Sequence, residues 1–191
     1  MKCLLLLAMA AVSALSAAQF TEGNLVASVV GDGGDQTDNQ PVVLRELTVT
    51  GASVGSDFSL NGINGRNVTT TYGETSEGQV SRSGNGLFLT VCGYDLAPHS
   101  TAIFSTFDTL RVVARISNGK AITFSGNFTV YDPVTFKGDG VRGAYSRTGR
   151  DFIVTGGDAG LTVGTFGGPI NQYFAGDYSS RSVSYNGGQY V

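Results

Sequence analysis

The chain has 191 residues, of which 41% are hydrophobic and 14% are charged, and its formal net charge is −3. The apolar content excludes a disordered chain, which combines low hydrophobicity with high net charge. The weakly negative net charge gives no indication of a basic surface that would attract nucleic acid or an anionic membrane. The 28 glycines and the low charged fraction favour strands joined by tight turns over helices.

Residues 1–18 have the layout of a secretory signal peptide. Lys2 provides the positive end, Leu4–Leu15 the apolar core, and Ser16-Ala17-Ala18 the small residues of a cleavage site before Gln19. The apolar run is shorter than the ~20 residues of a membrane-spanning helix, and no second run follows. We therefore expect a secreted protein, or a periplasmic one in a bacterium, whose mature domain is residues 19–191 without a membrane span.

Cysteine usage limits how the mature chain can be stabilised. Removal of the leader leaves Cys92 alone, so no intrachain disulfide can form and the fold depends on its sheets. Cys92 ends the apolar run Leu87–Val91, which predicts a buried and unreactive thiol. The one histidine, His99, lies in a proline-containing loop, which makes a catalytic Cys/His pair the weaker interpretation.

The first two strands are expected at 24–30 and 42–50, with an acidic loop between them. Asp32, Asp35 and Asp38 recur at three-residue spacing among glycines, and such carboxylates are weak candidates for binding a hard cation. The spacing matches neither an EF-hand nor a repeated calcium-binding glycine motif. A solvated hairpin loop explains the same residues, so we expect no metal and no cofactor.

Two catalytic-looking motifs are better explained as loops. Gly51–Gly55 has the spelling of a nucleophile elbow around Ser53, but no amphipathic helix follows it. Gly138–Gly143 has the spelling of a dinucleotide fingerprint, yet it leads into a strand and turn. Weak strands are expected near 57–60 and 67–72. No catalytic residue is assigned from these motifs.

A β-hairpin is expected after residue 109. Segments 110–117 and 120–131 are joined by Asn118-Gly119, a strong signal for a two-residue turn. In the first strand apolar residues alternate with Arg111, Val113 and Arg115, which predicts one buried face and one face toward solvent. Two glycosylation sequons, at Asn67 and Asn127, are candidates if the source is eukaryotic.

Three segments share one layout, at 77–93, 142–157 and 181–191. Each opens with a charged residue and continues through a glycine turn to an aromatic residue. The step from Arg142 to Arg181 is close to the ~40 residues of a four-stranded propeller blade. The strands group into units at 24–72, 78–131 and 141–174, with a fourth begun at 181. We expect an all-β, partial β-propeller of four-stranded antiparallel blades, about three blades and the start of a fourth.

In such a fold each small sheet obtains its core from its neighbours. The residues expected to be buried between sheets are Phe88, Val91, Val112, Ile116, Phe152, Val154 and Val163. Glu77, Arg142 and Arg181 hold equivalent places in the three segments. If rotation relates the units, these charges form a ring at one end of a central channel.

The repeated residues resemble those of secreted, largely uncharacterised β-propeller-like proteins. The matching positions are Glu77, Gly78, Ser81, Ser83, Gly86, Leu89, Gly93, Tyr94, Asp95, Arg142, Gly143, Ala144, Arg181, Val183, Gly188, Gln189 and Tyr190. The resemblance implies a propeller-like fold and secretion, and it brings no assigned reaction. Such proteins close a full ring of ~4–8 blades. We therefore expect this chain to continue beyond Val191 or to be completed by a second copy.

A binding or scaffolding module is the first functional hypothesis, with an extracellular glycan or protein as ligand, because glycine-rich loops on a rigid ring suit recognition. The second is a carbohydrate-active lyase or hydrolase, which requires two converging carboxylates such as Glu77 with Asp95 or Asp139. The third is a structural protein of a cell wall or matrix. No residue pattern identifies the ligand or a reaction.

Overall fold

The computed structural model describes residues 19–33, 38–71, 73, 76–100, 109–128, 140–156, 161–172, 183, 185–186 and 189–190. These residues contain fourteen strands, and every strand pairing is antiparallel. The described part has no helix, and accordingly none that could cross a membrane. The predicted all-β class is confirmed.

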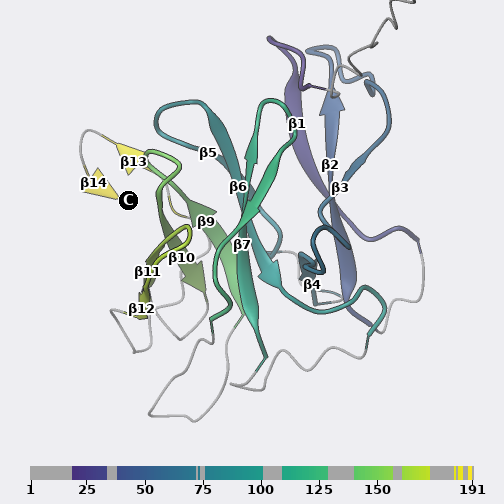
Figure 1. Ribbon diagram of the computed structural model, residues 1–191. Coiled ribbons are helices and arrows are strands. Elements are labelled where there is room, and N and C mark those ends of the chain that lie inside the picture. The colour runs from purple at the N-terminus through teal and green to yellow at the C-terminus, as the bar shows by residue number, and fades with distance from the viewer. Residues whose placement is uncertain are drawn as a thin grey trace, which may run out of the picture.

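Twelve of the strands form three layers (Figure 1). The first layer is β1 (Leu25–Val30), β2 (Gln40–Leu47) and β3 (Phe58–Ser59), followed by the linking strand β4 (Thr69–Thr70). The second layer is β5 (Val80–Arg82), β6 (Phe88–Tyr94), β7 (Arg111–Ser117) and β8 (Ile122–Phe124). The third layer is β9 (Val141–Tyr145), β10 (Asp151–Gly156), β11 (Leu161–Thr165) and β12 (Ile170–Gln172). A last hairpin consists of β13 (Tyr185–Asn186) and β14 (Gln189–Tyr190).

The predicted number of strands in each unit is correct, but the predicted separation of the units into individual sheets needs one correction. Each of the three units holds four strands, and the repeated segments form the hairpins β5–β6, β9–β10 and β13–β14. The first two units are not separate sheets, because β4 pairs with both β2 and β6. Together they make one eight-stranded sheet, whereas the third unit is a four-stranded sheet of its own.

Hydrophobic clusters lie on both sides of the second layer. Its Val91, Val112 and Ile116 pack with residues of the first layer such as Leu44. On the opposite face, Cys92 and Val113 pack with Phe152 and other residues of the third layer. In Figure 1 the second layer accordingly lies between β1–β3 on the right and β9–β12 on the left.

The expectation of a solvent-facing side on β7 is wrong. Arg111 and Val113 are fully buried, because the third layer covers the face that the alternation assigned to water. The contact is close enough for Thr90 Oγ1 to donate to Ala144 O at 2.9 Å. The apolar side of the same strand is predicted correctly, apart from Leu110, which is exposed.

Most of the predicted core is confirmed. Five of the seven residues are buried, and the exceptions are Phe88 and Val163, which are half-buried. Phe152 packs against Phe166, with ring centroids 5.1 Å apart. A Cβ at Gly164 would lie 2.5 Å from the Phe152 ring, so this strand needs glycine where the ring crosses it.

The β7–β8 turn differs from the prediction. Lys120 N donates to Ser117 O and Ser117 N donates to Ala121 O, so the loop has three residues, 118–120. In loops of this kind the third residue adopts the left-handed conformation, and here Lys120 does so with φ of 57°. The Asn118-Gly119 pair is part of the turn but does not form the two-residue loop by itself.

The first and second layers are joined at one end of their strands. There Thr69 of β4 pairs with Pro41 of β2 and with Tyr94 of β6. Gly93 permits this approach, because a Cβ there would lie 2.6 Å from Thr69 O. At the opposite end, where β1 and β6 begin, no described strand links the layers. We call these the joined end and the open end.

Candidate binding groove

A groove of about 620 Å³ lies at the open end, between the first and second layers. Residues 20–26, which lead into β1, form one wall. The other walls come from β5, the β5–β6 turn and the β7–β8 turn. The groove is therefore the space where two layers that meet at the joined end have separated.

The rim of the groove carries exposed aliphatic side chains. Leu87 of the second layer is 63% exposed, and Leu25 of the first layer is 56% exposed. Leu25 pairs with Leu47 and shares the face of β1 that carries Val29, so it lies at the outer edge of the groove. Exposed Glu22 and Arg82 also line the groove. Apolar contact surface with a few charged groups is the usual composition of a ligand site.

A cluster of side chains, which we call the clasp, connects the two layers beside the groove. Phe20 N donates to Asn118 O at 3.0 Å, and the Phe20 side chain is buried in the core between the layers. Lys120 Nζ lies 4.7 Å from the centroid of the Phe20 ring and 3.9 Å from Glu46 Oε2. Asn24 completes the clasp by donating to Glu46 Oε1 at 2.7 Å.

The surroundings of Glu46 favour its charged form. Burial raises the pKa of this carboxyl, but hydrogen bonds from Asn24 and Thr21 and the positive charge of Lys120 outweigh burial and bring the pKa below its usual value. Thr21 N donates to Glu46 Oε1 at 2.7 Å. The carboxylate thus fixes the segment that forms one wall of the groove.

Of the channel-ring candidates, Glu77 is buried near the joined end. It accepts hydrogen bonds from Tyr94 OH and from Thr71 N, both at 2.8 Å. Arg142 lies on β9 and is half-buried, while Arg181 falls outside the described residues. The ring of three charges stays a prediction.

Arg111 is a buried charge that the sequence pattern placed in solvent. Its Nη1 donates to Thr109 O at 2.6 Å, and its guanidinium carbon lies 5.5 Å from the centroid of the Tyr94 ring. Burial, together with the charge of Glu77 and the hydrogen bond to it, raises the pKa of Tyr94, so the phenol stays neutral and acts as a donor. These contacts stabilise the interior of the fold.

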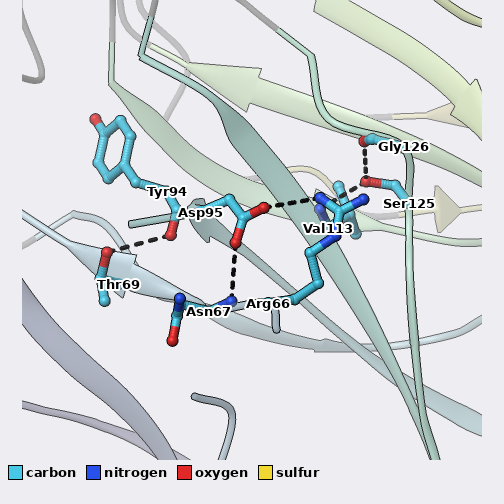
Figure 2. A network of polar contacts seen from close by, with 8 residues as sticks. All are labelled: Arg66, Asn67, Thr69, Tyr94, Asp95, Val113, Ser125 and Gly126. Atoms are coloured by element: carbon cyan, nitrogen blue, oxygen red, sulfur yellow. Dashed lines mark hydrogen bonds and ion pairs between the residues drawn. The ribbon is translucent and has the colours of Figure 1, made fainter. Parts of the chain in front are cut away.

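Two of the carboxylates considered for catalysis, Glu77 and Asp95, have different hydrogen-bond partners. Figure 2 shows Asp95 between Arg66 and Asn67, with Arg66 Nη1 2.8 Å from Oδ2 and Asn67 N donating to Oδ1 at 2.9 Å. Glu77 has the separate partners described above. Asp139 lies outside the described residues, so its pairing with Glu77 stays a prediction. Asp95 therefore fixes the segment before β4, a structural task.

The acidic loop, which was considered as a cation site, contacts a histidine in the structure. Asp32 Oδ2 lies 3.0 Å from His99 Nε2, and His99 N donates to Asn39 O at 2.9 Å, so this loop contacts the loop after β6. Asp38 is half-buried and Asp35 lies outside the described residues. Among the residues that the structure describes, no three metal-binding side chains come together.

The two sequons differ in exposure. Asn127 is exposed, although its Thr129 is not among the described residues. Asn67 is half-buried, and its Oδ1 accepts a hydrogen bond from Gly62 N at 3.0 Å. Thr69 of the same sequon is buried and donates to Tyr94 O. In the folded chain, Asn127 is the more accessible of the two.

The remaining motifs have structural explanations. Cys92 is fully buried, and burial together with the charge of Glu77 raises the pKa of its thiol, which keeps it unreactive. Ser53 is exposed and forms a bridge with Leu47 in place of a strand-to-helix turn. The end of the segment 138–143 begins strand β9.

The groove itself could not be recognised in the sequence, because three distant segments form it. The sequence holds no signal for it, because the exposure of Leu25 and Leu87 is visible only in the folded chain. Comparison of the chain with protein-family models, with curated proteins and with solved structures finds no match.

Proposed function

We propose that the chain is a secreted, β-propeller-like module that binds an extracellular protein segment in the groove at the open end. The observation that supports this role is the pair of leucines on the rim, one from each layer. Large aliphatic side chains cost free energy when they face water. A ligand that covers Leu87 in the groove and passes over the edge strand β1 to Leu25 would recover that cost and bring Arg82 and Glu22 within reach of polar partners.

The chemistry of the rim favours a protein over a glycan. Sugar rings usually pack on the open faces of aromatic side chains. The aromatic ring lining this groove near the surface, Phe88, is half-buried, and the guanidinium carbon of Arg115 lies 4.9 Å from its centroid. The leucines offer instead the contact that apolar peptide side chains need.

The propeller-like part of the proposal is supported by the way the layers cover one another. Val29 and Val43 are paired on the face of the first layer that points away from the second, and both are half-buried. The far face of the third layer, in contrast, packs with Val183 just before the last hairpin. A further unit of the same kind would cover the outer face of the first layer.

The groove is tested by charging its rim. Leu25→Asp and Leu87→Asp are screened, beside the wild type, against arrays of extracellular proteins and of glycans. The matched control is Val49→Asp, because Val49 is 76% exposed but does not line the groove. We expect both groove variants to bind a protein ligand at least tenfold more weakly, or ~1.4 kcal/mol, and the control to bind normally.

Other outcomes would change the proposal. Equal loss in the control, or none in the groove variants, would place the binding surface elsewhere. Binding confined to glycans would replace the protein ligand, and release of shortened glycan chains would favour the enzyme hypothesis.

A further inference from the structure

Three side chains of the clasp meet at one carboxylate. Asn24 precedes β1, Glu46 lies on β2, and Lys120 belongs to the β7–β8 turn. Asn24 Nδ2 donates to Glu46 Oε1 at 2.7 Å, while Lys120 Nζ lies 3.9 Å from Glu46 Oε2. Glu46 therefore holds a carboxamide on one oxygen and an amine on the other.

The amine lies in apolar surroundings. Lys120 Nζ is 4.7 Å from the centroid of Phe20 and 5.9 Å from that of Phe58, and the two rings contact each other edge to face. The side chains of Lys120 and Glu46 are 15% and 4% exposed. The amine and the carboxylate are therefore both largely shielded from water.

The backbone of the β7–β8 turn fixes the place from which the Lys120 side chain leaves the chain. The Lys120 φ of 57° lies in the left-handed region, which is unfavourable for residues other than glycine, asparagine and aspartate. A turn closed by Asn118 and Gly119 alone would avoid placing lysine there. The three-residue loop requires this conformation at its last position, which holds the lysine beside Phe20 and Glu46.

We propose that Lys120 and Asn24 form an intramolecular amide bond, with Glu46 transferring the protons. The product is a covalent link between the first and second layers at the open end. It needs no oxidant and no cofactor.

The reaction balances with these three side chains. Glu46 accepts a proton from the Lys120 ammonium, and the free Nζ attacks Cγ of Asn24, forming the new C–N bond. Glu46 then returns a proton to Nδ2, the bond between Cγ and Nδ2 breaks, and ammonia leaves. Nζ must lose a second proton to become an amide nitrogen. Glu46 accepts this proton as well and passes it to the ammonia, which departs as ammonium. Because Nδ2 already donates to Glu46, the acid is at the leaving group. Holding the reacting groups on one carboxylate replaces a bimolecular encounter by a local step.

Such a bond would stabilise this chain in the way that disulfides stabilise other secreted domains. A link between residues far apart in sequence restricts the unfolded chain, as a disulfide does. Only Cys92 lies within the expected mature region, so an intrachain disulfide is excluded there. The amide bond would keep the clasp closed beside the groove.

The direct test is a peptide map of the purified, folded full chain. Trypsin does not cleave after an acylated lysine, so the bond predicts that residues 116–137 stay intact and joined to the peptide that contains Asn24 and ends at Arg45. The joined mass should be one ammonia less than the sum of the two peptides. Mapping is preferable to intact mass, because Gln19 also loses ammonia by cyclisation when it is the N-terminal residue.

Variants separate the chemistry from the packing. Lys120→Arg keeps a positive charge without the nucleophilic amine, and Glu46→Gln keeps hydrogen-bonding groups without the base. Both should abolish the joined peptide and lower the melting temperature. The matched control is Asn118→Ser, in the same turn, because Asn118 contacts Phe20 through its backbone oxygen. It should retain the joined peptide.

Separate peptides from folded wild-type protein, with cleavage after Lys120, would overturn the proposal. The same holds if Glu46→Gln forms the bond as completely as the wild type. If a variant does not fold, the wild-type map still decides the question.

Discussion

The two ends of the contact between the first and second layers are held together in different ways. At the joined end, backbone hydrogen bonds run from β2 through β4 to β6, and Glu77, Tyr94 and Arg111 are buried beside them. At the open end, the layers meet mainly through the side chains of the clasp and leave a groove between them. Backbone pairing and buried side chains fill the joined end, whereas the open end has room for a ligand.

This difference indicates where each end tolerates change. Buried donors and acceptors at the joined end have few substitutes, because an unsatisfied polar group in the interior costs ~1–3 kcal/mol. Side chains on the rim of the groove already face water, so their replacement affects binding before stability. The comparison predicts large stability effects at the joined end and smaller ones at the open end.

The largest effect is expected for Glu77→Ala. It removes the acceptor of Tyr94 OH and Thr71 N, two buried donors, and should lower the free energy of unfolding by ~2–5 kcal/mol. Urea unfolding measures the change. Glu22→Ala, at an exposed glutamate of the groove, is the control and should stay within ~0.5 kcal/mol. Equal effects of the two substitutions would contradict the contrast between the ends.

An intermediate effect is expected for Gly93→Ala, which adds one methyl group where β4 meets β6. The new Cβ would lie 2.6 Å from Thr69 O and 2.8 Å from Val68 Cγ1, and such overpacking costs ~1–3 kcal/mol. Gly119→Ala is the matched change at the open end, because its Cβ meets nothing closer than Ser117 Oγ at 3.9 Å. Thermal unfolding of both variants should show a loss only for the first.

The smallest effect on stability is expected at acid pH, through Asp151 in the β9–β10 turn. This turn lies beside the β5–β6 turn. Burial raises the pKa of Asp151, but hydrogen bonds from Thr148 and the charge of Arg147 outweigh it, so the pKa falls below its usual value. A carboxylate of this kind contributes stability above its unfolded pKa of ~3.9. That contribution is lost as the pH falls through the lower, folded pKa.

Asp151→Asn should therefore flatten the dependence of stability on pH in the acid range and leave the joined end unaffected. Unfolding measured at a series of pH values from neutral to acid tests this. An unchanged profile would mean that Asp151 does not stabilise the turn.

Sequence patterns predicted the strands well because strands depend on local features. The partial alternation within 42–50, the glycine turns, and the repeated segment around Phe88 and Phe152 are visible without a structure. The same patterns failed where the outcome depended on a distant layer. Arg111 alternates like a surface residue, and only the third layer shows that it is buried. Lys120 gives no local sign of the φ that the register of β7 and β8 imposes on it.

The groove and the clasp were not predictable for the same reason. The groove exists only because the first and second layers separate at the open end. The clasp forms only after folding, because it brings together residues from three distant segments: Phe20 and Asn24, Glu46, and Lys120. The propeller-like closure and the ligand stay predictions.

The second layer buries both of its faces, and this affects how the molecule opens. The inner strands β6 and β7 cannot reach water when a single neighbour moves away, because the other layer still covers one side. Their backbone amides should exchange with solvent only through the rarest, most complete openings of the molecule. β1 pairs with β2 alone, and it can separate in a smaller fluctuation. The chain therefore has a slowly exchanging centre beside a faster-exchanging wall of the groove, so a ligand can enter without loosening the core.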